Sequence, residues 1–142
     1  MKATLHPNGF WVILLGSLFG FRLRLHYWPD ATEDKSPHNH RSWFISLPLF
    51  GELMETTYEE VPGDEPVRVC GSLPGNGIPD TIEGRAGALR AGLIRRHRLL
   101  LPYLCKAEAI HSVIVPNKTA TLILFGPDKQ RPKAWIEWKQ QN

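Results

Sequence analysis

Hydrophobic and polar residues alternate one by one along several stretches of this chain. The clearest is Phe21–Trp28 (FRLRLHYW), in which every second residue is apolar. A period of two is typical of a strand whose two faces meet different surroundings. One face of this strand carries Arg22, Arg24 and His26. These side chains either line an interior or face solvent, and the alternation is compatible with both.

The other apolar stretches are short and are separated by glycine and proline. Twelve glycines and twelve prolines among 142 residues favour strands and turns over long helices. Pro48, inside the apolar run 41–50, predicts that this strand ends, bulges or bends there. The pattern predicts a buried strand pair over 10–21 and strands over 21–28, from near 38, and over 41–50, 52–61, 67–73, 96–104, 111–116, 119–125 and 133–138. It predicts turns at 62–64 and 74–77, and it leaves 81–92 ambiguous.

Eight or more short strands without a long amphipathic helix predict an all-β fold, an antiparallel sandwich or jelly roll. The length predicts a single domain over residues 1–142. The run 10–21 has about twelve apolar positions, fewer than the roughly twenty that a membrane span needs. The two cysteines, Cys70 and Cys105, form no C-x-x-C pair, and no secretion signal is evident. We therefore expect a cytoplasmic protein without a membrane partner.

The formal net charge is +3, and five arginines of the segment 85–98 carry much of the excess. A basic cluster can bind an acidic partner or nucleic acid, or it can be a solvated loop or edge strand. Aromatic residues do not alternate with these arginines, as a base-stacking surface would require. The sequence therefore favours a solvated loop or edge strand over a nucleic-acid partner.

Candidate chemistry centres on the pair His38 and His40, with His111 far away in sequence. On a strand, residues i and i+2 point to the same face, so the pair would present two imidazoles side by side. Such pairs also occur by chance on surface strands. If His111 lies nearby, the three rings make a site that suits Fe(II), Zn(II), Cu(II) or Ni(II). Without a carboxylate ligand the ion would keep its full charge and would favour an anionic substrate.

The segment 36–60 (SPHNHRSWFISLPLFGELMETTYEE) resembles the first motif of the cupin superfamily, G-x5-H-x-H-x3–4-E-x6-G. His38, His40 and Gly51 match its spacing, Phe44 stands where a glutamate ligand would be, and His111 would supply the histidine of the second motif. The segment looks especially like the three-histidine thiol dioxygenase branch, the cysteine dioxygenase-like proteins, which also lack that glutamate. The resemblance implies a jelly roll, or double-stranded β-helix, with a mononuclear iron centre.

The chain also departs from that branch. Where the second motif has Pro-x-Gly, this sequence has Lys106-Ala107-Glu108, and Val115 replaces the asparagine that follows the histidine. The stretch 122–128 (LILFGPD) contains no histidine or tyrosine, whereas dioxygenases of small amino-acid thiols carry a Ser-His-Tyr relay there. The resemblance therefore supports metal binding but not thiol oxidation as the specific reaction.

Other polar residues could serve such a site. Arg22 or Arg24 could bind a substrate carboxylate, with His26 beside them. Tyr58 and Tyr103 are either hydrogen-bond donors near the metal or core aromatics. Glu52 or Glu55 could orient a ligand histidine. His6 and His97 look incidental.

Together these features predict a non-heme Fe(II) enzyme that catalyses the O2-dependent oxidation of a small substrate that is anionic or chelating. Zn, Ni, Mn and Cu are the alternative metals. A metal-dependent isomerase or hydrolase and a non-catalytic small-molecule-binding cupin are the alternative functions, and a homodimer is left open.

Overall fold

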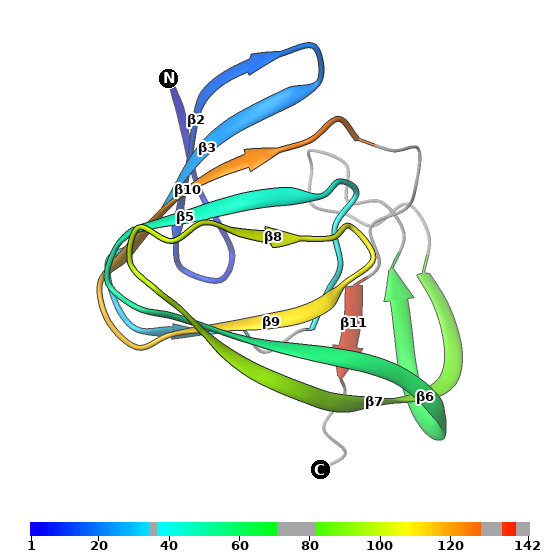
Figure 1. The fold of residues 1–142 in the computed structure, drawn as a ribbon. Coiled ribbons are helices and arrows are strands. Elements are labelled where there is room, and N and C mark those ends of the chain that lie inside the picture. Colours follow the sequence, from blue (N-terminus) through cyan, green and yellow to red (C-terminus); the bar gives the residue numbers. More distant parts are fainter. Residues whose placement is uncertain (35–36, 71–81, 129–134, 139–142) are drawn as a thin grey trace.

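Two curved antiparallel sheets enclose a common interior (Figure 1). The computed structural model describes residues 1–34, 37–70, 82–128 and 135–138. The six-stranded sheet has the order β1 (Lys2–Leu5), β2 (Trp11–Leu18), β3 (Phe21–Trp28), β10 (Thr119–Phe125), β5 (Phe44–Phe50), β8 (Tyr103–Cys105). The second sheet has the order β11 (Trp135–Trp138), β6 (Leu53–Cys70), β9 (Ile110–Val115), β4 (Thr32–Glu33), and β7 (Ile82–His97) pairs with β6.

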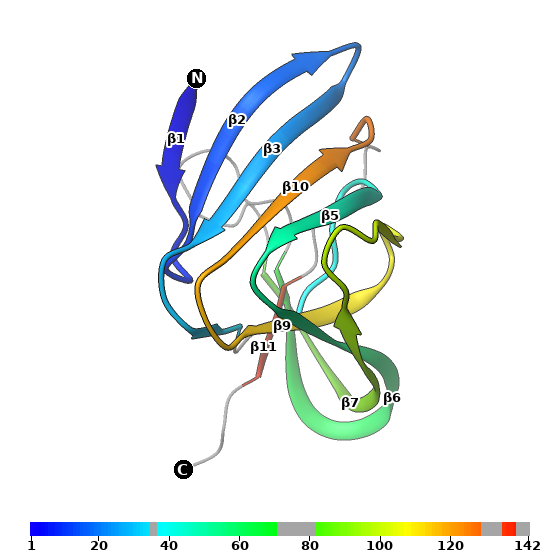
Figure 2. The ribbon, with the colours of Figure 1, turned by 60° about the vertical axis from the view of Figure 1, so that its left-hand side comes forward.

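The predicted all-β class is confirmed. The described residues contain no helix, and hence none that could cross a membrane. Figure 2 shows β1, β2, β3, β10 and β5 side by side in the six-stranded sheet. The core between the sheets has two clusters, one around Phe44 and Phe125 and the other around Trp28, Leu53 and Val115.

Local patterning predicts several strands well. β3 and β10 match the expected bounds, and β9 matches within a residue. Of the end, bulge or bend expected at Pro48, the structure shows a bulge. Ala120 pairs with Phe50 while Thr121 pairs with Pro48, so Leu49 is the extra residue. A proline is tolerated there because the ladder of hydrogen bonds is already interrupted.

The boundaries of the long strands were predicted wrongly. Residues 62–64 do not end a strand, because β6 continues to Cys70 and the tract forms a register shift opposite β7. The ambiguous segment 81–92 belongs largely to β7, which ends at His97. The strand predicted over 96–104 is therefore interrupted between β7 and β8, where Leu100 has a left-handed φ of 56°. The turn predicted at 74–77 lies outside the described residues.

The strand pair predicted over 10–21 is present as β2 and the start of β3, but it is not buried along its length. At the tip of the hairpin Leu18 is 67% and Phe19 is 87% exposed. The tip lies beyond the strands that cover the rest of the pair, so its apolar side chains meet solvent. The prediction of burial was wrong there.

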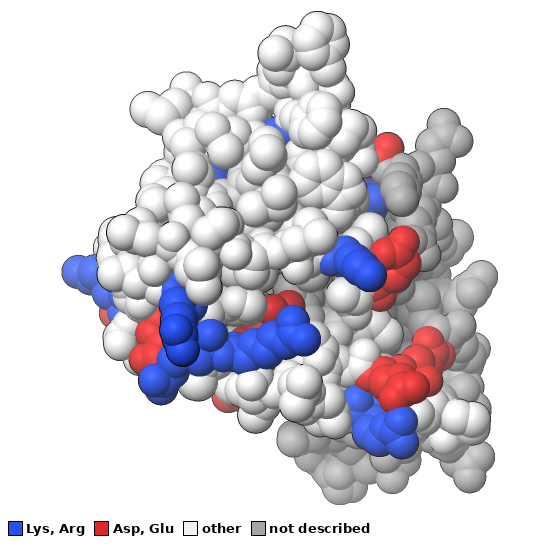
Figure 3. Space-filling model, in the orientation of Figure 1, with Lys and Arg blue, Asp and Glu red and all other residues white. Residues whose placement is uncertain are grey.

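The arginine-rich segment lies mostly on β7, whose described pairing is with β6 alone, as expected for a solvated edge strand. Arg90 contacts Glu59 at 2.5 Å and Arg96 contacts Glu52 at 2.6 Å, across the pair of strands. On the face shown in Figure 3, basic side chains lie next to acidic ones. Exposed pairs of this kind contribute little to stability but reduce the local charge.

Gly51 connects β5 to β6 with a φ of +82°. A Cβ atom at this position would overlap Thr119 and the carbonyl of Lys118. The turn therefore requires glycine, for both its dihedral angle and its close approach to the start of β10. Thr119 fixes the same turn, since its hydroxyl donates to the carbonyl of Glu52 at 3.1 Å.

Candidate metal centre

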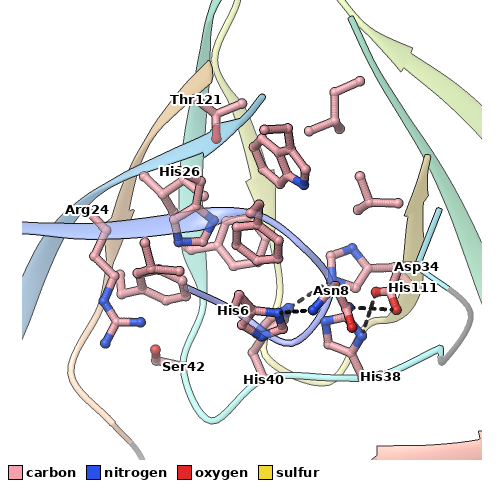
Figure 4. A pocket seen from close by; sticks show the side chains of 18 of the residues that line it. His6, Asn8, Arg24, His26, Asp34, His38, His40, Ser42, His111 and Thr121 are labelled. Carbon is pink, nitrogen blue, oxygen red and sulfur yellow. Dashed lines mark hydrogen bonds and ion pairs between the residues drawn. The ribbon is translucent and has the colours of Figure 1, made fainter. Parts of the chain in front are cut away.

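His38, His40 and His111 meet at one end of the interior (Figure 4). The sequence suggested that the His-x-His pair lies on a regular strand. This was wrong, because β5 begins only at Phe44. Instead, His38 forms an isolated bridge with His111, in which each amide donates to the other's carbonyl at 2.9 Å. The amide of His40 donates to the carbonyl of Ala107 at 3.0 Å. Main-chain hydrogen bonds thus hold the segment against β9 and bring the three rings together.

The three imidazoles form a nearly equilateral triangle. Their ring centroids are 4.9 Å apart for His38 and His40, and 5.0 Å apart for the two pairs that include His111. One ring nitrogen from each residue lies within 4.8 Å of the others, and the Nε2 atoms of His40 and His111 are 2.8 Å apart. Convergent imidazole nitrogens on one side of a cavity suit a first-row transition-metal ion.

Carboxylates contact the Nδ1 atoms of two of these rings. Nδ1 of His38 lies 3.1 Å from Oδ2 of Asp34, and Nδ1 of His111 lies 2.8 Å from Oε1 of Glu55. A carboxylate accepts the Nδ1 proton of a neutral imidazole, which leaves the lone pair on Nε2. The expectation that Glu52 or Glu55 orients a histidine is met by Glu55, whereas Glu52 pairs with Arg96 at the surface.

Glu55 also contacts a histidine that the sequence analysis set aside. Nε2 of His97, at the end of β7, lies 2.6 Å from Oε2 of Glu55, and its ring stacks on Tyr103 with centroids 3.4 Å apart. Burial alone would raise the pKa of Glu55, but hydrogen bonds with His111 and His97 lower it to about 2. Only the pairing of β6 with β7 brings His97 to this carboxylate, and no local pattern signals it.

A second group of ligand atoms lies behind His111. Glu55, Cys105 and His111 each offer one atom, all within 4.8 Å of one another. Burial raises the pKa of the Cys105 thiol to about 12, so the sulfur keeps its proton. Both oxygens of Glu55 already contact His111 and His97, and the histidine triangle is therefore the better candidate.

Phe44, at the position of the missing glutamate, is a buried core residue. Its ring centroid lies 5.0 Å from that of His40 and 6.0 Å from that of His111. An apolar ring therefore packs beside the triangle, where the imidazole nitrogens converge.

A cavity of about 320 Å³ extends from the histidines along the inner face of β3. Arg22, Arg24 and His26 all line it, so this face of the strand looks inward. Arg22 is held at the mouth by an ion pair with Asp128 and by a hydrogen bond of 3.2 Å to Ser42. Arg24 lies farther in, with its guanidinium carbon 5.1 Å from the centre of the Phe125 ring. Burial and the neighbouring Arg22 lower the pKa of Arg24.

His26 is deeper still and is surrounded by aromatic rings. Its ring centroid lies 5.2 Å from that of Phe10 and 5.8 Å from that of Trp28, and its Nε2 atom has no hydrogen-bond partner among the described residues. Burial, followed by the charges of Arg24 and His6, lowers the pKa of His26 to about 3. The imidazole is therefore neutral at physiological pH.

The two tyrosines differ in position. Tyr103 lines the cavity, and burial raises its pKa, so its hydroxyl stays protonated. Tyr58 is not part of the cavity wall. Its hydroxyl lies 3.0 Å from the Ser112 hydroxyl, away from the histidines. The structure thus places Arg22, Arg24, His26, Tyr103 and the three histidines around one cavity, with Tyr58 outside it.

No protein-family model and no curated protein matches this sequence. Solved structures do match the fold. An RmlC-like cupin from Shewanella frigidimarina NCIMB 400 aligns with a TM-score of 0.57 and 13% identity, over 91% of this chain and 86% of that one. The chain has the cupin fold. A cupin superfamily protein from Desulfitobacterium hafniense DCB-2 aligns with a TM-score of 0.50 and 13% identity, over 87% of this chain and 82% of that one. The jelly roll implied by the sequence resemblance is therefore confirmed, while the thiol dioxygenase branch stays a prediction.

Proposed function

We propose that this protein binds one divalent transition-metal ion through His38, His40 and His111 and uses it to oxidise a small anionic substrate with O2. The observation that carries the proposal is the orientation of two of the imidazole rings. In His38 and His111 a carboxylate faces Nδ1, which leaves Nε2 as the donor atom. Such carboxylate–histidine pairs orient metal ligands and raise their basicity.

Fe(II) is the proposed metal, with Zn, Ni, Mn and Cu as the alternatives. Phe44 occupies the place of a carboxylate ligand. The proposed ligands are therefore three imidazoles, which supply no negative charge to the ion. An ion held in this way would attract an anionic group of the substrate. Bound iron(II) would supply the electron-transfer chemistry with O2 that protein side chains lack.

The chain's own residues would bind and orient the substrate. The guanidinium of Arg24 faces the cavity and would pair with a carboxylate or another anion. The Tyr103 hydroxyl, which stays protonated, would be a further hydrogen-bonding group on the cavity wall. Phe44 and Phe125, both buried, exclude water from the space between these groups.

Phe44 is also what supports the resemblance to the thiol dioxygenase branch, since that branch lacks the same glutamate. The missing relay residues in 122–128 leave the oxidised group open. A cytoplasmic location and a single domain over 1–142 belong to the same proposal, and a homodimer remains open.

The test combines metal content with oxygen consumption. We expect purified protein, reconstituted anaerobically with Fe(II), to bind one equivalent, and each of His38→Ala, His40→Ala and His111→Ala to lose that binding. Tyr58→Phe is the matched control, since Tyr58 is away from the cavity wall, and it should bind metal normally. Retention of stoichiometric metal by all three histidine variants would overturn the proposal.

Oxygen electrode measurements then separate the functional alternatives. Turnover of small anionic substrates that consumes no O2 would favour a metal-dependent isomerase or hydrolase. Failure to take up any transition metal would favour a non-catalytic binding protein.

A further inference from the structure

Arg24 is a partly buried cation that forms no ion pair with the described residues, although the charge of Asp128, the partner of Arg22, also acts on it. Its neighbour on the same face, Arg22, is committed to Asp128 and Ser42. The guanidinium of Arg24 lies over the ring of Phe125. Taking a charge partly out of water without pairing it costs free energy, so its retention in a cavity indicates that an anion completes it.

The described wall between Arg24 and the histidines is a chain of aromatic rings. Phe125 lies next to the Arg24 guanidinium, 5.4 Å from Phe44 and 6.3 Å from His40 between centroids. On the neighbouring side Phe10 stacks on Trp28 with centroids 4.7 Å apart, and both rings line the cavity. Aromatic rings gain most from ligands that are themselves flat and can stack or meet them edge to face.

The cavity is large enough for a one-ring ligand. Its volume of about 320 Å³ lies at the lower end of the range for small-molecule sites. It accommodates one ring with a carboxylate and one further substituent. The steps from the Arg24 guanidinium to Phe125 (5.1 Å) and from Phe125 to His40 (6.3 Å) mean that one such molecule can reach both ends.

We infer that the substrate is an aromatic carboxylate whose anionic group binds Arg24 and whose ring lies against Phe125 and Phe10, with its remaining substituent toward the histidines. This inference rests on the proposed function for the chemistry at the metal, but the aryl-carboxylate site itself is built from residues that are not metal ligands. His26, which is neutral, adds no cation at the inner end. Arg22 and Arg41 also line the cavity, but Arg22 is paired with Asp128, and we assign the anion to Arg24 because its guanidinium lies over the Phe125 ring.

The test measures binding of benzoate to metal-free, full-length protein by calorimetry, and the loss of binding in variants. We expect saturable binding with a one-to-one stoichiometry. Arg24→Gln should weaken it at least tenfold, and Arg24→Lys should restore part of the affinity. Arg90→Gln is the matched control, because Arg90 is an exposed arginine that pairs with Glu59 on the outer strands. It should bind benzoate as the parent protein does.

Two further probes, one neutral and one non-planar, separate the contribution of the charge to binding from that of the flat ring. Benzamide keeps the ring but loses the charge, and cyclohexanecarboxylate keeps the charge but loses the flat ring. Each should bind at least tenfold more weakly than benzoate. Absence of benzoate binding at millimolar concentration, unchanged affinity in Arg24→Gln, or equal binding of cyclohexanecarboxylate would overturn the inference.

Because benzoate binding is measured on metal-free protein, the proposed oxidation and the aryl-carboxylate site can fail independently. If benzoate binds through Arg24 but the protein takes up no metal, the proposed oxidation fails while the aryl-carboxylate site stands. If metal binds through the histidines but benzoate binding is absent, the substrate class fails and the metal centre stands.

Discussion

Glu55 joins two histidines from different strands, with Oε1 2.8 Å from Nδ1 of His111 and Oε2 2.6 Å from Nε2 of His97. Glu55→Gln keeps the shape but removes the charge that holds the His111 proton on Nδ1. We expect metal affinity to fall by roughly 10- to 100-fold, as for other partners of ligand histidines. Competition with a chromogenic chelator measures the change. An affinity equal to that of the parent protein would show that Glu55 does not support the site.

His97→Phe tests the outer part of the same arrangement. Phenylalanine can keep the stack on Tyr103 but cannot hydrogen-bond to Glu55. Metal affinity should fall less than in Glu55→Gln, because the contact between Glu55 and His111 remains. The same chelator assay ranks the two variants, and a larger loss in His97→Phe would contradict this order.

Phe44→Glu introduces a carboxylate at the position where the cupin motif carries one. Without metal the charge is buried in the core and should destabilise the protein by several kcal/mol. Added Mn(II) or Fe(II) should recover much of the loss, because metal binding stabilises the native state. Thermal unfolding with and without metal measures the difference. Phe44→Leu is the control, whose melting temperature should respond to metal as the parent's does.

Gly51→Ala should destabilise the protein by at least about 2 kcal/mol. The substitution forces a residue with a Cβ into a left-handed conformation and against Thr119 and the Lys118 carbonyl. Gly16→Ala is the matched control, because its Cβ would meet no atom within 4 Å. Urea unfolding of both variants provides the comparison, and similar losses in the two would contradict the role assigned to Gly51.

His26 predicts a pH dependence of stability. Its pKa falls from 6.5 to about 3 in the folded protein, since burial penalises the charged ring. The unfolded chain therefore binds a proton below about pH 6.5 that the folded chain does not take up until about pH 3. Stability from this residue is full above pH 6.5 and is lost as the pH falls through that window.

The measurement compares the free energy of unfolding of the parent protein and of His26→Phe at pH 7 and about pH 4.5. His26 alone should cost the parent roughly 2 kcal/mol more than the variant over this interval. Titrations common to both proteins cancel in the difference. Equal losses would mean that His26 is not held neutral in the fold.

The sequence predicts the fold class and much of the histidine triangle because these depend on local information. Alternation in β3 and β10 marks two-faced strands, and the spacing of His38, His40 and Gly51 matches a known motif. The limits of β6 and β7 depend instead on pairing between the two strands. Hydrogen bonds on both sides of residues 62–64 carry the strand past a proline and a glycine that locally indicate a turn.

The same distinction explains the residues that were left open or missed. Whether Arg24 faces inward is decided by the pairing of β3 with β10 and by the strands that close over them. His97 reaches Glu55 across 42 residues of sequence. Neither the inward orientation of Arg24 nor the contact between His97 and Glu55 follows from the residues that flank them along the chain.

The main-chain bridge between His38 and His111 has one further consequence. Two of the three proposed ligands are already joined through their own backbone amides and carbonyls, although 73 positions separate them in the chain. The conformational entropy of closing that long loop is therefore spent when the sheets form and not when an ion arrives. A metal entering such a preassembled site would find its affinity governed by ligand chemistry, and removing it should leave the barrel folded.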